Sequence, residues 1–331
     1  MAQEIVKKPL DLETVKTQEE DSLFYFVDSN SINSEKITAP RYSYWRSVFR
    51  IFFKKKINWL ILALLLFIIL MTILYPAFNP YDEYENVIDA TWKNLSPAEA
   101  MAKSGGFSLK YLLGTGQFGN SIFNGIWAGS RTSLSLATIC AAINMLIGIL
   151  IGAVWGYNKT LDAVLNIFYN IIANVPYILL ITVLVYVIGS GFWPFVFALT
   201  ITGWLGIAYF FRTQVLIIRD REYNLASRCL GTPMFRVVGH NILPFLISVI
   251  VTILATELPS YISMEVFLAY IGVGLSASEA SLGRMITEAQ TAFTSFPWSF
   301  WSPVAIASII TISLYILGQN LADASDPRTH M

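Results

Sequence analysis

Six long apolar runs constrain this chain more than any other feature of its sequence. A helix needs about 20 mostly apolar residues to cross a bilayer, because every backbone N–H and C=O must be satisfied within the segment. The runs therefore predict an all-α, polytopic membrane protein with six transmembrane helices. The predicted spans are 57–75, 127–156, 161–189, 193–218, 241–272 and 300–320.

The composition agrees with a membrane protein. Of the 331 residues, 55% are hydrophobic and 13% are charged, whereas a soluble domain has about 25% charged residues. The formal net charge is zero, so the overall charge balance does not indicate a partner. Cys140 falls in a predicted span and Cys229 in a predicted loop, and we interpret both as structural.

The distribution of Lys and Arg predicts the orientation of the spans. Residues 41–56 carry six cations and no acid directly before the first span, which predicts a cytoplasmic N-terminus. Six spans then return the C-terminus to the cytoplasm. The predicted organisation is a weakly ordered tail at 1–40, an external loop at 76–126, a core of five further spans at 127–320 and a cytoplasmic tail at 321–331.

The segment 41–56 has its own pattern. Trp45, Val48, Phe49 and Phe52 fall at helical spacing, while the face formed by Arg46, Arg50 and Lys54 is basic. This pattern predicts an amphipathic helix that lies in the membrane interface. The alternative is that the cations are simply the positive flank of the first span.

The motifs that signal chemistry are absent from the sequence. There is no G-x-x-x-x-G-K-[ST], H-E-x-x-H, C-x-x-C or G-x-S-x-G, and the two histidines are His240 and His330. The chain is therefore predicted to be no enzyme, to hold no metal and to bind no cofactor of its own.

Two carboxylates interrupt the fifth apolar run. Glu257 and Glu265 stand eight residues apart, with Pro259 between them as a candidate kink. Carboxylates are costly in a bilayer and for that reason are candidates for a function. Both readings stay open for each residue: it lines a transport pathway, or it packs by hydrogen bonding to neighbouring helices.

The predicted cytoplasmic loop Arg219–Pro244 carries the most local structure. It reads as two short helices joined at Gly231, with Thr232 as the cap of the second helix and Pro233 in its first turn. A basic, partly apolar helix–turn–helix between two spans suits docking of a soluble protein. The alternative is an ordinary positively charged loop, which its length and the Gly-Thr-Pro sequence disfavour.

This loop resembles the EAA loop of permease subunits in bacterial ABC importers, written E-A-A-x3-G-x9-I-x-L-P. Arg221-Glu222-Tyr223 resembles the R-E-Y that precedes the loop in the peptide and nickel branch. The triplet falls on Leu225-Ala226-Ser227, the glycine on Gly231 and the final pair on Leu243-Pro244. The sequence departs from the pattern at two positions, with Leu225 in place of the glutamate and Asn241 in place of the isoleucine.

Further stretches of residues 110–328 resemble the same branch in the same order. They are Leu113-Gly114-Thr115, Gly129–Leu134, Glu265 with Gly272 and Gly274, Phe296-Pro297-Trp298, and Asn320–Arg328. Here too the match is incomplete, because Gly116 and Asn120 stand where the branch has Asp and Arg. The resemblance is to the second permease subunit of oligopeptide and dipeptide importers, and it implies the type I ABC importer fold in a bacterial cell membrane.

The resemblance also implies partners and roles. The partners are a homologous permease that completes a heterodimer, two cytoplasmic ATPases that bind ATP and Mg²⁺, an external substrate-binding protein and a peptide, with no nucleic acid. The coupling segment would be Thr232–Gly239, with Met234, Phe235 and Arg236 against the ATPase. Alternatives are another cargo (dipeptide, nickel or a glutathione-like peptide) and, less favoured, an ion-coupled secondary carrier.

Overall fold

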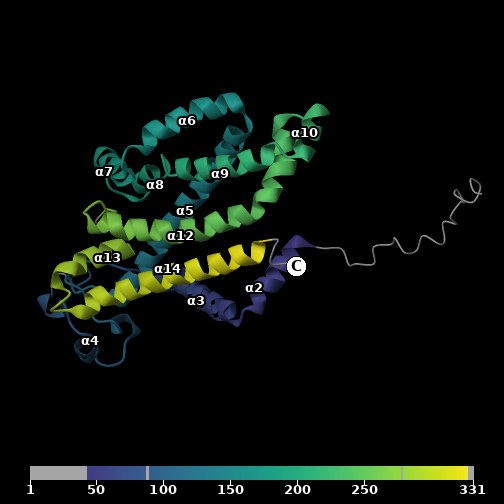
Figure 1. Cartoon of the computed structure of the whole chain (residues 1–331). Coiled ribbons are helices and arrows are strands. Elements are labelled where there is room, and N and C mark those ends of the chain that lie inside the picture. The colour runs from purple at the N-terminus through teal and green to yellow at the C-terminus, as the bar shows by residue number, and fades with distance from the viewer. Residues whose placement is uncertain (1–42, 87–88, 277–278, 327–331) are drawn as a thin grey trace, which may run out of the picture. The chain divides into compact units, whose positions relative to one another are not determined.

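The computed structural model describes residues 43–86, 89–276 and 279–326, and these residues are mostly helical (Figure 1). The described part of the chain contains no strand, only an isolated bridge between Thr115 and Ser121. The predicted all-α class is confirmed. The tail predicted at 1–40 lies outside the described residues.

Five helical runs are long and apolar enough to cross a membrane, and all five coincide with predicted spans. A sixth crossing is present if a bent helix pair is counted as one span. The five are α3 (Lys56–Phe78), α5 (Ile122–Tyr157), the run Phe192–Arg219, the run Met234–Tyr270 and α14 (Pro297–Ser325). At 1.5 Å per residue, the 36 residues of α5 extend about 54 Å, well beyond a hydrocarbon core of about 30 Å.

The span predicted at 161–189 is not one straight helix. It consists of α6 (Lys159–Ala173) and α7 (Tyr177–Ile188), which meet at an angle of 78°. Pro176 lies at the junction. Proline has no N–H to donate and disfavours the α conformation in the residue before it, which accounts for the break.

The span predicted at 193–218 is also divided, into α8 (Phe192–Thr200) and α9 (Trp204–Arg219). The carbonyl of Leu199 accepts hydrogen bonds from the Tyr177 hydroxyl at 3.0 Å and from the Asn144 amide at 3.3 Å. A Cβ on Gly203 would lie 2.5 Å from that carbonyl oxygen. The break therefore depends on a glycine and on polar side chains from two other helices.

Several helices extend beyond their predicted ends. Helix α5 begins at Ile122 rather than 127, with the Ser121 hydroxyl accepting from the Asn124 N–H at 3.1 Å. Helix α14 continues to Ser325, so 321–325 are helical and not part of a tail as predicted. A helix, α2 (Tyr44–Lys54), is present within the segment predicted at 41–56, and it buries Val48 and Phe52.

The hydrophobic core is divided between two clusters. The larger one joins α5 to α7, α8, α12 (Ile247–Tyr270), α13 (Leu282–Ala289) and α14. Glycines let α5 and α9 approach closely: a Cβ on Gly152 would lie 2.4 Å from the Ala208 carbonyl oxygen, and one on Gly156 would lie 2.7 Å from that of Arg212. Small residues four apart let helix backbones approach in a membrane.

The two ends of the helix bundle differ. One end, the hairpin end, carries α10 (Glu222–Cys229) and α11 (Met234–Val237) between α9 and α12. The other, the loop end, carries residues 79–121 and α13 (Figure 1). The long loop predicted at 76–126 is partly helical, with α4 (Pro97–Lys103) and 3₁₀ turns at Ala90–Trp92 and Leu109–Tyr111.

A capping box stabilises the start of α4 at the loop end. The Ser96 hydroxyl and the Glu99 carboxylate each pair with the other residue's backbone N–H. The hydrogen bonds from the Ser96 backbone and hydroxyl hold the pKa of Glu99 below its usual value. The box fixes one helix start within the long loop.

Candidate functional site

The loop predicted to dock a soluble partner forms a helical hairpin, residues 220–246, which we call the coupling hairpin. Gly231 ends α10 with a φ of 78°. The Thr232 N–H donates to the Ser227 carbonyl at 3.1 Å and the Gly231 N–H to that of Arg228 at 3.0 Å. These two bonds form a Schellman motif, which requires a left-handed residue at the position of the glycine. The predicted role of Gly231 in the turn is confirmed.

The second helix of the hairpin differs from the prediction. Its N-cap is Pro233, without a side-chain cap, so Thr232 does not cap it. Helix α11 continues through a π turn at Val238–Ile242 and a 3₁₀ turn at Leu243–Leu246 into α12. Pro244 lies in the 3₁₀ turn, where its missing N–H fits the altered bonding. The coupling segment is therefore the beginning of the helical run that crosses the membrane.

An apolar cluster fixes the hairpin to the membrane helices. Val237 and Ile242 are fully buried with Phe211 and Val215 of α9, and the same cluster includes Met145 of α5. The Arg219 guanidinium adds a hydrogen bond of 3.0 Å to the Gly156 carbonyl in the last turn of α5. The hairpin is therefore packed against α5, α9 and the start of α12.

The two arms of the hairpin are also joined by buried amides. The Asn241 amide donates to Asn224 Oδ1 at 3.2 Å and to Ser227 Oγ at 3.3 Å. Asn224 has no exposed surface and its own amide donates to the Ile218 carbonyl at 2.9 Å. Asn241 is thus the hydrogen-bond bridge between α10 and the turn that leads into α12.

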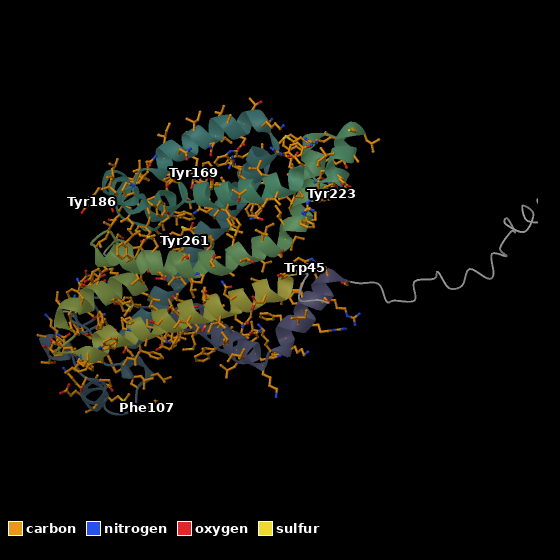
Figure 2. All side chains as sticks on the ribbon, in the orientation of Figure 1. Trp45, Phe107, Tyr169, Tyr186, Tyr223 and Tyr261 are labelled. Atoms are coloured by element: carbon orange, nitrogen blue, oxygen red, sulfur yellow. The ribbon has the colours of Figure 1, made fainter. Side chains whose placement is uncertain are left out.

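The opposite side of the hairpin is exposed and largely apolar. Leu230 is 86% exposed and Phe235 is 76% exposed, with Tyr223 on the same hairpin (Figure 2). Of the predicted contact residues, Glu222, Tyr223, Ala226, Gly231, Pro233, Phe235, Arg236 and Pro244 are exposed, whereas Thr232, Met234 and Leu243 are half-buried. Leu225 and Leu230 were not predicted, although their apolar side chains in a polar loop are a readable signal.

Glu265 is buried in the bundle with almost no exposed surface. Its Oε2 accepts from the Ser133 hydroxyl of α5 at 3.0 Å and from the Gly283 N–H at the start of α13 at 3.3 Å. A Cβ on Gly283 would lie 2.7 Å from Glu265 Oε1. Of the two alternatives, this geometry favours packing: Glu265 joins α12 to α5 and α13.

Glu257 lies two turns away in α12 and is half-buried. Its carboxylate interacts with the Tyr261 hydroxyl, which accepts from the Asn144 amide at 2.5 Å. The same amide reaches the Leu199 carbonyl at the break between α8 and α9. Glu257 is therefore the more exposed end of a polar network that connects α12 to α5 and the broken span.

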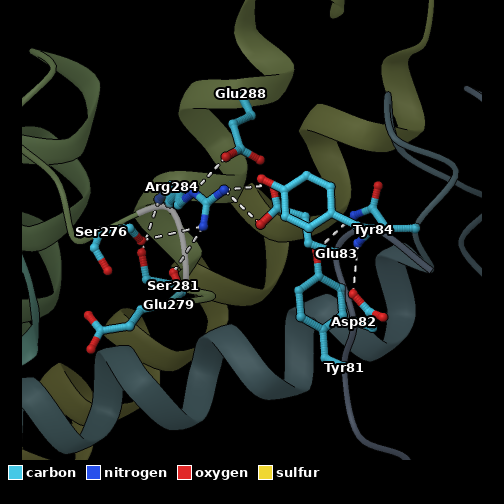
Figure 3. Close-up of polar contacts among 10 residues, drawn as sticks. Tyr81, Asp82, Glu83, Tyr84, Ser276, Glu279, Ser281, Arg284 and Glu288 are labelled. Atoms are coloured by element: carbon cyan, nitrogen blue, oxygen red, sulfur yellow. Dashed lines mark hydrogen bonds and ion pairs between the residues drawn. The ribbon is translucent and has the colours of Figure 1, made fainter. Parts of the chain in front are cut away.

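Ionic contacts at the loop end hold residues 79–86 against α13 (Figure 3). The Arg284 guanidinium contacts both oxygens of Glu83 at 2.6 and 2.7 Å, and Glu288 at 2.6 Å. Burial raises the pKa of Glu288, against the lowering effect of the adjacent Arg284. The side chains of Arg284 and Glu83 are 13% and 9% exposed, so this pair is largely shielded from water. Sequence reasoning missed it, because the two residues lie 201 positions apart.

Long apolar helices, a polar network at a broken span and a hairpin with exposed apolar side chains are features typical of a multi-pass membrane transport subunit. The family model described as "Binding-protein-dependent transport system inner membrane component" matches residues 144–331, more than half of the chain. A second model, "N-terminal TM domain of oligopeptide transport permease C", matches residues 43–97. The chain belongs to the family of inner membrane components of binding-protein-dependent transport systems.

Similar proteins extend over nearly the whole chain. The oligopeptide transport system permease protein AmiD of Streptococcus pneumoniae is 43% identical, over 93% of this chain and 97% of the relative. Two Bacillus subtilis proteins, the dipeptide permease DppC and the oligopeptide permease OppC, are each 30% identical over 93% of this chain. The matched region covers 93% of DppC and 97% of OppC. The chain is thus a permease subunit of an ABC importer in the cell membrane.

Proposed function

We propose that this subunit imports peptides as one half of an ATP-driven permease. The observation that carries the proposal is the coupling hairpin, which exposes Tyr223 and Leu230 on its first arm and Phe235 on its second arm, and whose second arm continues into α12. Apolar side chains exposed on a cytoplasmic loop suit a permanent protein contact. Two relatives that are oligopeptide transport permeases support the cargo.

The proposed machine has three kinds of protein partner. A homologous permease completes the pathway, two ATPases bind ATP and Mg²⁺, and an external binding protein delivers the peptide. ATP-driven closure of the ATPases would displace the hairpin, and the apolar cluster around Val237 and Ile242 would pass that displacement to α5, α9 and α12. This subunit contributes motion and a pathway wall, and the ATPases contribute the hydrolysis. The proposed orientation places the hairpin end in the cytoplasm and the loop end outside.

The test is uptake by the reconstituted complex. The chain is purified with the subunits that accompany it from native membranes, reconstituted in liposomes with its binding protein, and supplied with a labelled pentapeptide. We expect uptake that needs ATP inside and persists when the proton gradient is collapsed. Uptake that follows the proton gradient without ATP would overturn the proposal in favour of a secondary carrier.

A second cargo, the dipeptide, is favoured by one specific observation. Two relatives that share 30% and 28% identity with the chain are named as dipeptide permeases. Competition between labelled pentapeptide and unlabelled dipeptides in the same liposomes separates the two. Complete inhibition of pentapeptide uptake at a low dipeptide concentration would show that dipeptides are the preferred cargo.

A further inference from the structure

A cavity opens at the loop end of the bundle, between α5, the end of α3 with the residues that follow it, the start of α8 and residues 279–280. Its volume is about 540 Å³, and its lining includes Pro80, Tyr81, Arg131, Ser135, Phe192 and Glu279. Pockets for small ligands occupy roughly 300–1,000 Å³ and combine an apolar wall with a few polar groups. The aromatic, hydroxyl and charged groups of this cavity fit that description.

Arg131 is the only charged residue in the 36 residues of α5. It lies nine positions after Ile122, about 14 Å along the helix axis, and its side chain is exposed. Among the described residues its guanidinium has no hydrogen-bond acceptor and no ion pair. An arginine on an apolar helix of this length, with no acceptor for it among the described residues, is a candidate for contact with a ligand.

Glu279 supplies the opposite charge to the same cavity. Its Oε2 is buried and, within the described part of the chain, has no hydrogen-bond partner. The carboxylate points away from Arg284, whose guanidinium contacts only the backbone carbonyl of this residue (Figure 3). Its backbone N–H donates to the Ser276 carbonyl at 3.0 Å, which fixes its position. The cavity therefore presents a cation and an anion that do not pair with each other.

We propose that this cavity is a subsite for the carboxyl-terminal end of a peptide. The Arg131 guanidinium takes the terminal carboxylate as a bidentate pair, and Glu279 accepts hydrogen bonds from the last peptide N–H groups. The Ser135 hydroxyl lines the cavity as a further donor, and that of Thr132, which donates to the Ala128 carbonyl at 3.3 Å, lines it as an acceptor. This inference rests on the proposed function, and it places the subsite where a peptide released outside would first meet the permease.

The other occupant with the right chemistry is a phospholipid headgroup. Either occupant brings an anion to Arg131, and Glu279 repels a phosphate and a terminal carboxylate alike. The two differ in their donors: a peptide end carries backbone N–H groups that can pair with the Glu279 carboxylate, whereas a phosphodiester group has no N–H or O–H to donate. This difference favours the peptide.

The first test compares two peptides in the reconstituted complex with its own partners. One pentapeptide has a free carboxyl terminus and the other is amidated, and the ratio of their uptake rates is measured. We expect Arg131→Gln to lower the free-to-amidated ratio at least about tenfold, the size of a lost charged hydrogen bond. Lys93→Gln removes an exposed cation of the loop end that does not line the cavity, and it should leave the ratio unchanged.

The second test detects binding without transport. Ser135→Cys places an exposed thiol in the cavity, in a Cys229→Ser background that removes the exposed native cysteine. Excess free-carboxyl pentapeptide should slow labelling of this thiol by a charged methanethiosulfonate reagent, and Arg131→Gln should abolish the protection. Protection by added anionic lipid but not by peptide would overturn the proposal in favour of the headgroup.

The outcomes separate this proposal from the function on which it rests. No ATP-dependent uptake of either peptide by the wild-type complex would overturn the proposed function. Normal wild-type uptake, with the same ratio in Arg131→Gln and no peptide protection of Ser135→Cys, would overturn the subsite alone. Loss of ATPase assembly in Arg131→Gln would assign the residue to structure and would also overturn the subsite.

Discussion

Asn241, in the turn that leads into α12, donates a hydrogen bond of 3.2 Å to Asn224 Oδ1 in α10. The bond joins the two arms of the coupling hairpin behind its exposed face. The sequence departs from the EAA pattern at position 241, where an isoleucine is usual, and the structure explains the departure: the asparagine satisfies the fully buried Asn224. The hairpin is thus held by a polar bridge as well as by its apolar cluster.

Asn241→Ala should loosen the hairpin. The substitution leaves the buried Asn224 oxygen without this donor, at a cost of about 1–3 kcal/mol. Arg228 and Arg236 provide trypsin sites within the hairpin. We expect cleavage there to rise about fivefold or more, since proteolysis follows the population of the open form.

The matched control is His240→Ala, at the exposed neighbouring position. It should cleave at the wild-type rate and retain the co-purified ATPase. Equal cleavage of the Asn241 and His240 variants would show that the bridge contributes nothing measurable. Asn241→Ile should behave as Asn241→Ala does, because an apolar side chain cannot pair with Asn224.

Gly231→Ala tests the hinge of the hairpin. A left-handed backbone costs a residue with a Cβ about 1–2 kcal/mol, and at Gly231 that Cβ would meet nothing within 4 Å. The defect should therefore come from the backbone alone and appear as weaker ATPase co-purification and slower ATP-driven uptake. Gly231→Asn should be milder, because asparagine tolerates this conformation better.

Gly239→Ala is the control for the hinge. A Cβ there also meets nothing within 4 Å, and the residue has no positive φ. Its uptake should match the wild type. If Gly231→Ala transports as well as Gly239→Ala in assembled complexes, the left-handed turn is not needed for coupling.

Gly283→Ala tests the junction formed by Glu265. The new Cβ would lie 2.7 Å from Glu265 Oε1 and 2.9 Å from Val266 Cα, so the backbone must shift at a cost of about 1–3 kcal/mol. Cys140 is free and buried, and in a Cys229→Ser background a thiol-reactive dye reports its exposure on heating. We expect the Cys140 thiol of this variant to become accessible to the dye at a lower temperature than in the wild type.

Gly206→Ala serves as the comparison for that junction. Gly206 lies in α9, and a Cβ there meets nothing within 4 Å. Alanine should leave stability unchanged or raise it by about 0.5–1 kcal/mol. A midpoint for Gly283→Ala at or above that of Gly206→Ala would contradict a packing role for Glu265.

The sequence predicted what depends on local pattern. Apolar length located the spans, and the position of Gly231 located the turn, because a Schellman motif needs only neighbouring residues. Pro176 is also a local signal for the broken span, since proline disrupts a helix at its own position. Hydropathy alone does not predict the break, because the apolar run continues across the bend and hydropathy contains no information on the direction of the helix axis.

The contacts that define the buried sites could not be predicted in this way. Ser133 and Glu265 are 132 positions apart, and no periodicity indicates that they meet. The same holds for Asn144 and the Leu199 carbonyl, since a backbone acceptor freed by a helix break has no signature in the sequence. Arg131 lies in the stretch Gly129–Leu134 that resembles the family, but no local pattern indicates that the described residues offer its guanidinium no acceptor.

Arg284→Met tests the ionic cluster at the loop end. It leaves Glu83 and Glu288 close together without their cation, and breaking a buried pair costs about 3–5 kcal/mol. The 31% exposure of Glu288 places the expected loss at the low end of that range. Hydrogen exchange of residues 79–86 should be faster than in the wild type at pH 7. Glu83→Gln retains a hydrogen-bond acceptor and should have a smaller effect.

The pH dependence gives this prediction a sign. Burial already raises the pKa of Glu288, and removing Arg284 takes away the cation that lowers it. An acid whose pKa is raised on folding stabilises the fold below its unfolded pKa, and that contribution is lost as pH rises through its folded pKa. The Arg284→Met defect should therefore shrink when the pH falls from 7 toward 5, each variant being compared with the wild type at the same pH. A defect that stays constant or grows on acidification would mean that Glu288 is not the group left unpaired.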